Sequence, residues 1–164
     1  MELVIFKNTK AGFSVIEMMV VVAIIGILAM IAIPSSMGRI IKEQVWAAIP
    51  LSDAAKEPIA AQWKALKTLP VDNIEAGLPT PDKVVSNFIN KLEVNNGVIH
   101  MTFGNKAHAQ IKDKILSIRP AVISESNAVP IAWVCGNAKA PDKMTVLGDN
   151  KTDIEGKYLP FACR

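Results

Sequence analysis

The sequence has few of the side chains on which catalysis and metal binding depend. Its 164 residues include only two histidines and two cysteines. Neither histidine stands at zinc-ligand spacing from a cysteine or from the other histidine. The phosphate-binding loop that ends in Gly-Lys-Ser/Thr and the Gly-x-Ser-x-Gly nucleophile motif are both missing. We therefore expect a protein that is not an enzyme and that needs neither a metal nor another cofactor.

Strong charge of either sign is also missing. The formal net charge is +3, and no block of five like charges occurs. This balance is too weak to indicate nucleic-acid binding by itself. One group of cations lies close together in the sequence, and Asp113 dilutes it: Lys106, Lys112, Lys114 and Arg119. We interpret this group as a solvated face, with contact to DNA as the sharper alternative.

Long apolar runs are absent from most of the chain, but one lies near the N-terminus. Between residues 13 and 33, 18 of 21 residues are apolar, and only Ser14, Glu17 and Gly26 interrupt the run. A helix of about 20 apolar residues spans the hydrocarbon core of a bilayer. The residues after this run have the composition of an ordinary globular domain. The sequence therefore predicts one membrane-grade segment and one soluble domain.

A secretory signal peptide is the first alternative for the N-terminal region, but its features occur here in another order. Lys7 and Lys10 precede Gly12, the apolar run follows at once, and no small-residue cleavage site comes after it. Glu17 is also unusual, because a carboxylate in apolar surroundings is costly and usually has a partner and a function. The alternative for Glu17 is a position near the membrane interface, where its carboxylate reaches water.

The residues that begin at Gly12 resemble the class III signal of type IV pilins. The sequence GFSVIEMM is followed by the apolar stretch VVVAIIGILAMIAIP. The resemblance implies that a prepilin peptidase removes residues 1–12 by cutting after Gly12, and that the new N-terminal Phe13 is then N-methylated. It also implies a role in assembly for Glu17.

The same resemblance divides the rest of the chain. Residues 13–34 are expected to form a transmembrane and polymerisation helix, and residues 35–164 a globular pilin head. Gly26 and Pro34 delimit a weak point of this helix, because proline removes a backbone donor and disturbs the preceding turn. The fold implied is α+β: a long N-terminal helix packed on a four-stranded antiparallel sheet, with a C-terminal disulfide loop.

Periodicity in the head predicts its elements. An amphipathic helix is expected over residues 35–69, bent by Pro50 and Pro58, with Trp46 and Trp63 as packing anchors. Strands are expected at residues 88–94 and 98–103, joined by an Asn-Asn-Gly turn, then at 115–118, ended by Pro120, and at 131–135. The alternation of His100 with its apolar neighbours indicates a solvent-facing position.

Cys135 and Cys163 are the only cysteines. Because the head would be exported into an oxidising compartment, we expect a disulfide between them, with two free buried thiols as the alternative. We expect the precursor in the inner membrane of a Gram-negative bacterium and the mature chain in an extracellular fimbrium.

The expected partners are identical subunits in a helical filament, the prepilin peptidase, and an assembly machine whose ATPases lie outside this chain. The resemblance further implies adhesion and twitching motility, with contact to host surfaces or DNA also open. Two alternatives are a pseudopilin of a type II secretion system and a DNA-binding minor pilin.

Overall fold

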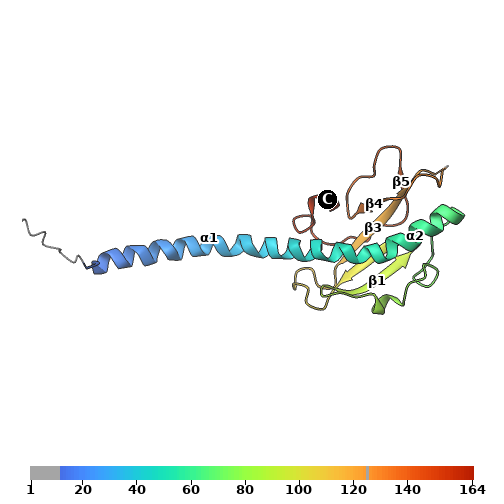
Figure 1. Cartoon of the computed structure of the whole chain (residues 1–164). Coiled ribbons are helices and arrows are strands. Elements are labelled where there is room, and N and C mark those ends of the chain that lie inside the picture. Colours follow the sequence, from blue (N-terminus) through green and yellow to red (C-terminus); the bar gives the residue numbers. More distant parts are fainter. Residues whose placement is uncertain (1–11, 125) are drawn as a thin grey trace, which may run out of the picture. The chain divides into compact units, whose positions relative to one another are not determined.

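The computed structural model describes residues 12–124 and 126–164, without the side chains of residues 32–36. The chain divides into two compact units, Met1–Met37 and Gly38–Arg164. Helix α1, Val15–Ala48, begins in the first unit and ends in the second (Figure 1). Apart from Gly12, the leader expected at residues 1–12 lies outside the described residues.

Two prolines shape the helical part of the second unit. Helix α1 ends at Ala48, and a 3₁₀ turn follows at Ile49–Ser52 with Pro50 in its first turn. Helix α2 then runs over Asp53–Leu66 and contains Pro58. The helix expected over residues 35–69 is therefore interrupted at Pro50, where proline supplies no N–H for the α-helical ladder. Pro58, in contrast, lies within α2 without ending it.

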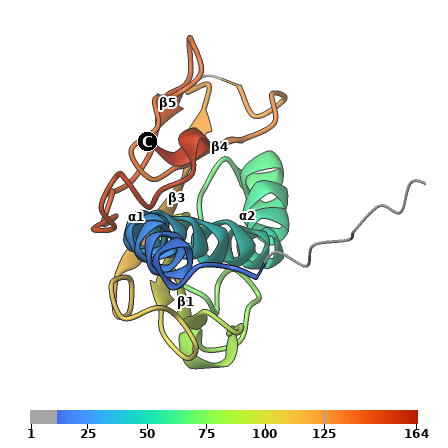
Figure 2. The same cartoon turned by 90° about the vertical axis from the view of Figure 1, so that its left-hand side faces the viewer.

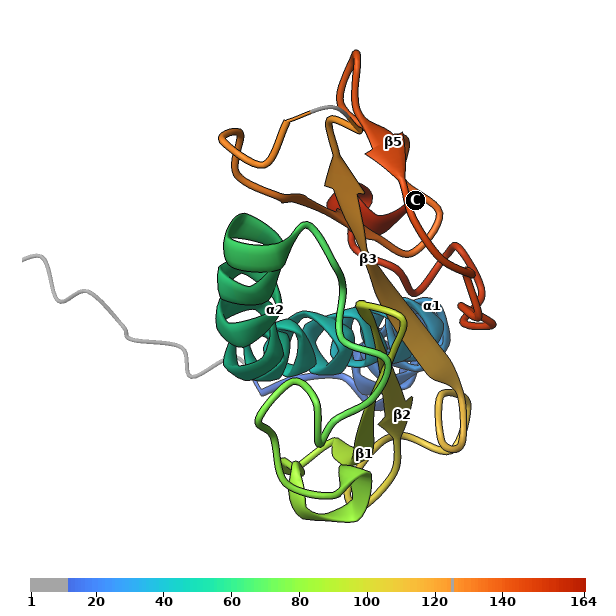
Figure 3. The same cartoon turned by 90° about the vertical axis from the view of Figure 1, so that its right-hand side faces the viewer.

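Five strands form one antiparallel sheet. They are β1 (Ile89–Asn95), β2 (Val98–Phe103), β3 (Ile115–Val122), β4 (Ala132–Cys135) and β5 (Thr145–Val146). The order is β1-β2-β3-β4, and the short β5 pairs with the end of β3 (Figure 3). Two further 3₁₀ turns lie at Pro81–Lys83 and Phe161–Cys163. The α+β fold is confirmed, with β5 as an addition to the four expected strands.

The hairpin between β1 and β2 matches its prediction closely. Asn96 and Gly97 have φ values of 48° and 79°, and this pair of positive values is what a two-residue type I′ turn requires. Strand β2 has the predicted bounds, and Asn95 pairs with Val98 across the turn.

Pro120 lies inside β3 and does not end it, contrary to the prediction. Its carbonyl accepts a hydrogen bond from the N–H of Leu147, so its nitrogen also faces the β5 side of the strand. On that side, the last pair between β3 and β2 is Ile118 with Ile99. Pro120 therefore lies beyond the end of the pairing with β2, where no acceptor of β2 needs a backbone N–H from β3. A sheet tolerates proline at such a position.

The core of the second unit lies between the sheet and the two helices. The C-terminal part of α1 and α2 lie on one face of the sheet (Figure 3). These helices contribute Ile41, Val45 and Ala48 from α1, and Ala55 and Ile59 from α2. The sheet contributes alternate residues of β1, β2 and β3, which include Leu92, Val94, Ile99, Met101, Leu116 and Ile118. Each of these residues is at most 2% exposed, so the second unit has a core of its own.

The two tryptophans expected as packing anchors behave differently. Trp63 is buried on α2, as predicted, whereas Trp46 on α1 is 62% exposed. Neighbouring positions Ile41 and Val45 define the buried stripe, and Trp46 falls beside it. The expectation for Trp46 is therefore wrong within this single chain.

Candidate processing and assembly site

The expected cleavage bond joins Gly12 to Phe13, directly before helix α1. Residues 12–14 are not helical, and α1 begins at Val15. Phe13 is 77% exposed, and apart from Gly12 and its chain neighbours no described atom lies within 4 Å of the position that a Cβ on Gly12 would take. The bond thus lies in exposed, non-helical chain, where a peptidase can reach it.

Glu17 lies in the first turn of α1. The backbone N–H of Ser14 donates a hydrogen bond to Oε2 of Glu17 at 3.4 Å. With Ser14 as the residue before the helix and Glu17 three positions later, this contact is one half of a capping box. A negative charge at this end also suits the helix dipole. The carboxylate therefore lies beside the residue that follows Phe13.

The first half of α1 exposes a continuous series of apolar side chains. Every described side chain from residue 12 to residue 31 is exposed. The large apolar ones are Phe13, Val15, Ile16, Met18, Met19, Val20, Val21, Val22, Ile24, Ile25, Ile27, Leu28, Met30 and Ile31. So much contiguous apolar surface indicates an interaction site.

No helix among the fully described residues is long and apolar enough to cross a membrane. The membrane-spanning helix expected at residues 13–34 includes residues 32–34, whose side chains the structure does not describe. It therefore stays a prediction. The backbone of α1 is helical throughout residues 26–34. A Cβ on Gly26 would meet nothing within 4 Å, and the side chain of Pro34 is outside the described set. The proposed weak point therefore also stays a prediction.

The expected disulfide is present, with a distance of 2.04 Å between Sγ of Cys135 and Sγ of Cys163. The C-terminal turn is also held by the N–H of Asn137, which donates to the carbonyl of Cys163 at 3.0 Å. Gly136 has φ +55°, and a Cβ there would lie 2.5 Å from that carbonyl oxygen. Glycine is therefore required where strand β4 meets the end of the chain.

The disulfide loop, residues 136–162, also covers part of strand β3. The N–H of Ser117 donates to Oγ1 of Thr152, and the N–H of Ile115 donates to Oδ1 of Asp153. The N–H of Lys151 in turn donates to Oγ of Ser117 at 2.9 Å. Figure 2 shows the C-terminal segments gathered beside β3 and β4, away from β1. The loop thereby satisfies donors at the edge of β3 that β4 does not reach.

His100 is buried, contrary to the solvent-facing position predicted for it. Only 4% of its surface is exposed, and its Nδ1 lies 2.9 Å from Oγ of Ser117. Burial is the main reason why the pKa of His100 lies below its ordinary value, and Lys151 acts in the same direction. His100 does alternate with the core residues Ile99 and Met101 along β2, as predicted. The side of the sheet on which it lies is covered by the disulfide loop and is not exposed to solvent.

The four basic residues that lie close together in the sequence, Lys106, Lys112, Lys114 and Arg119, differ in exposure and in their partners. Lys106 and Lys112 are exposed, whereas Lys114 pairs with Asp153 at 3.3 Å. Arg119 is half-buried, and its Nη2 donates to the carbonyl of Gly136. Across residues 12–124 and 126–164, no group of three or more histidine, cysteine or acidic side chains is placed to hold a metal ion.

Both the N-terminal segment and the head of this chain are similar to known proteins. Residues 42–164 match the pilin family, described as a bacterial filament protein, and residues 7–33 match the prokaryotic N-terminal methylation motif. A fimbrial protein of Neisseria meningitidis serogroup A is 31% identical, with 96% of each chain covered. The type IV major pilin protein PilE of Neisseria gonorrhoeae is 30% identical over the same shares. The fimbrial protein EcpC of Eikenella corrodens is 28% identical and covers 96% of this chain and 93% of its own.

These matches extend over both units and agree with the helix, the sheet and the disulfide already described. They do not favour the secretion pseudopilin or the DNA-binding minor pilin as alternatives. The chain belongs to the pilin family, the structural proteins of bacterial filaments.

Proposed function

We propose that this chain is made as a precursor, cut between Gly12 and Phe13, methylated at Phe13 and polymerised into a type IV pilus. Residues 1–12 would be the leader, residues 13–34 the helix that first anchors the precursor and later packs in the fibre, and residues 35–164 the head. The fibre would be a helical array of identical subunits on the cell surface, used for adhesion and twitching motility, with DNA uptake as a further use.

The observation that carries this proposal is the contrast between the two units. Between residues 12 and 31 every described side chain is exposed, although most are apolar. The Gly38–Arg164 unit, in contrast, buries a continuous core without any contribution from those residues. A helix of this kind requires an apolar environment from outside its own chain, which a membrane supplies before assembly and copies of the same helix supply afterwards.

Glu17 then acquires a partner at the moment of processing. Cleavage after Gly12 creates an amine on Phe13 that is protonated at neutral pH. Within one chain, Glu17 already accepts a hydrogen bond from Ser14. In a fibre core without water, an unpaired carboxylate would cost several kcal/mol, so pairing with the amine of a neighbouring subunit would fix the register of the added subunit.

Other partners follow from the same sequence of steps. A prepilin peptidase must act on the membrane-held precursor in the inner membrane of a Gram-negative cell. Extraction of the apolar helix from the membrane needs work, which an assembly machine with its own ATPases would supply. The chain itself carries no sequence motif for a nucleotide.

The test is a strain that carries Glu17→Ala. If Glu17 acts in assembly, the variant is cut normally after Gly12, the head is as stable as before, and the number of surface fibres falls at least tenfold. A blot that separates precursor from mature chain, beside a count of fibres in electron micrographs, measures both steps. Glu43→Ala is the matched control, because Glu43 is an exposed acid of the same helix and pairs with Arg39.

Two results would contradict the proposal in different ways. Accumulation of uncut precursor in the Glu17→Ala strain would assign Glu17 to recognition by the peptidase. Normal processing with abundant fibres would remove Glu17 from both steps.

A further inference from the structure

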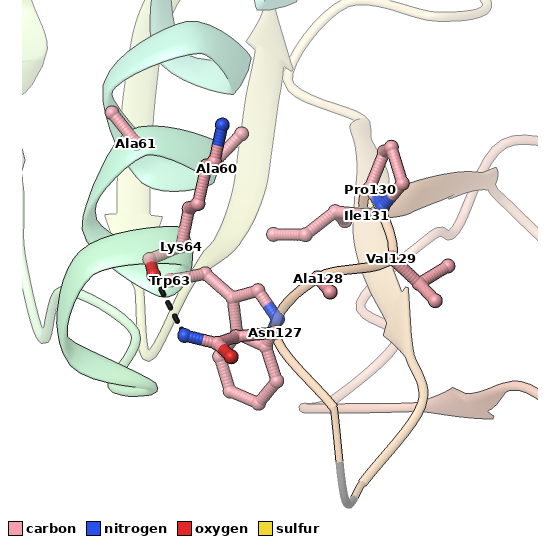
Figure 4. Close-up of a pocket in the computed structure, with 9 residues that line it drawn as sticks. All are labelled: Ala60, Ala61, Trp63, Lys64, Asn127, Ala128, Val129, Pro130 and Ile131. Atoms are coloured by element: carbon pink, nitrogen blue, oxygen red, sulfur yellow. Dashed lines mark hydrogen bonds between the residues drawn. The ribbon is translucent and has the colours of Figure 1, made fainter.

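A pocket of about 260 Å³ opens between helix α2 and the segment that leads into β4 (Figure 4). Ala60, Ala61, Trp63 and Lys64 line its helix side. Residues 127–131 line the opposite side. The volume lies just below the range of about 300–1,000 Å³ that holds drug-sized ligands, so an occupant must be smaller than those.

Local sequence explains why this space exists. Two consecutive alanines on α2 leave room above the indole of Trp63, whereas larger side chains would fill it. The opposite wall is tied to α2 by Nδ2 of Asn127, which donates to the carbonyl of Lys64 at 2.7 Å (Figure 4). That carbonyl lies in the last turn of α2, where backbone acceptors lack partners within the helix.

Trp63 supplies a donor that no described residue of the chain accepts. Its side chain is nine-tenths buried, and its Nε1 has no hydrogen-bond partner among the described residues. Figure 4 shows this nitrogen on the side of the indole that faces Asn127 and Ala128 across the pocket. Buried indole N–H groups usually find an acceptor, and the described part of the chain supplies none here.

The charges of the residues that line the pocket indicate which kind of ligand could supply an acceptor for Nε1 of Trp63. Of the nine lining residues, Lys64 alone is charged, and none is an acid. No ion pair joins Lys64 to an acid within the described part of the chain. The remaining walls are alanine, valine, proline and isoleucine, which favour an apolar body.

We propose that this pocket binds small monocarboxylates with a compact apolar body. The carboxylate accepts a hydrogen bond from Nε1 of Trp63 and lies near the ammonium of Lys64, and the apolar body rests against Ala60 and Ile131. In this structure Nε1 is almost completely covered, so we expect binding to move Asn127 and Ala128, the residues that face it in Figure 4, outward. This movement would lengthen the hydrogen bond that Nδ2 of Asn127 donates to the carbonyl of Lys64.

The probe is benzoate, titrated into the full chain in detergent micelles and labelled with ¹⁵N. The three tryptophans give separate indole N–H signals, and the loss of one in Trp63→Phe assigns that of Trp63. We expect a saturable shift of the Trp63 signal at millimolar benzoate, together with a shift of the Asn127 side-chain amide. Acetate, which lacks the apolar body, and benzyl alcohol, which lacks the charge, should each bind more weakly.

Two variants separate the pocket from general binding to the protein or the micelle. Ala60→Leu keeps a strong helix former and fills the space, so it should abolish the Trp63 shift. Lys64→Gln should weaken benzoate binding about two- to fivefold, while Lys112→Gln, outside the pocket, should leave it unchanged. Equal shifts of all three indole signals, a shift that persists in Ala60→Leu, or no saturable shift at all would overturn the proposal.

Discussion

Nδ1 of His100 lies 2.9 Å from Oγ of Ser117 on the next strand, and that oxygen also accepts a hydrogen bond from the N–H of Lys151. With a neutral His100, the hydroxyl of Ser117 can donate to Nδ1. Protonation turns Nδ1 into a donor, removes that acceptor, and places a charge on a side chain that is almost fully buried. The contact between β2, β3 and the disulfide loop therefore favours neutral His100.

This relationship predicts a pH dependence of stability. Burial lowers the pKa of His100 below its ordinary value of 6.5, Lys151 adds to the effect, and Glu93 and Asp149 oppose it. The unfolded chain then takes up its proton at a higher pH than the folded chain. The free energy of unfolding should be at its full value above about pH 7 and should fall as the pH drops through about 6.5 toward the folded pKa, by about 1.4 kcal/mol for each unit of difference.

Urea unfolding of the chain at a series of pH values between about 5.5 and 7.5 measures this slope. His100→Gln should flatten the slope, because glutamine does not titrate. His108→Gln is the control and should retain it, since His108 is half-exposed and its ring accepts a hydrogen bond from the backbone N–H of Gln110. A slope that persists in the His100 variant would assign the dependence to other groups.

Asn73 is predicted to stabilise the free edge of β1. Its Nδ2 donates to the carbonyls of Pro79 and Leu92, and its Oδ1 accepts from the N–H of Val94 at 2.7 Å. The side chain, 3% exposed, thus pairs with β1 in the way that another strand would. Asn73→Ala leaves these buried groups without partners and should lower the free energy of unfolding by about 2–4 kcal/mol.

Thermal or urea unfolding, followed by circular dichroism, measures the loss. Asn95→Ala, an exposed asparagine at the end of the same strand, should change stability by less than about 0.5 kcal/mol. Equal stabilities of the two variants would show that the amide of Asn73 is not needed at the edge.

The disulfide is predicted to contribute to the stability of the head. Its cysteines are 28 positions apart, and a loop of that length corresponds to about 3–4 kcal/mol in the loop-entropy account. The double variant Cys135→Ser, Cys163→Ser should therefore melt well below the parent chain and should not respond to a reducing agent. Identical melting of the parent under reducing and non-reducing conditions would exclude a stabilising bridge.

Features set by adjacent residues could be predicted from the sequence. The turn at Asn96 and Gly97 fixed the hairpin, because its backbone conformation requires those residue types. The disulfide followed from having only two cysteines in a chain expected to be exported. The apolar run and its single acid were likewise local, and the match to the methylation motif covers the same residues.

Features set by distant segments could not. His100 has the alternation of a solvent-facing residue, but residues 151–153, far along the chain, bind to β3 at Ile115 and at Ser117, the residue beside His100. Asn73 lies in a loop with no motif, and only the tertiary structure places it against β1. Trp46 shows the reverse error, because a large aromatic side chain suggested packing although its position lies beside the buried stripe of Ile41 and Val45. The pocket beside Trp63 also depends on a contact between α2 and residue 127.

The central claim is that this pilin is processed after Gly12 and built into a surface fibre. The most direct measurement is the intact mass of the main protein in fibres sheared from the cells. The account predicts a chain of 152 residues, the 164 of the precursor less the 12 of the leader, that begins at N-methylated Phe13 and lacks two hydrogens for the disulfide. Fibres whose main protein begins at Met1, or at an unmethylated Phe13, would contradict it.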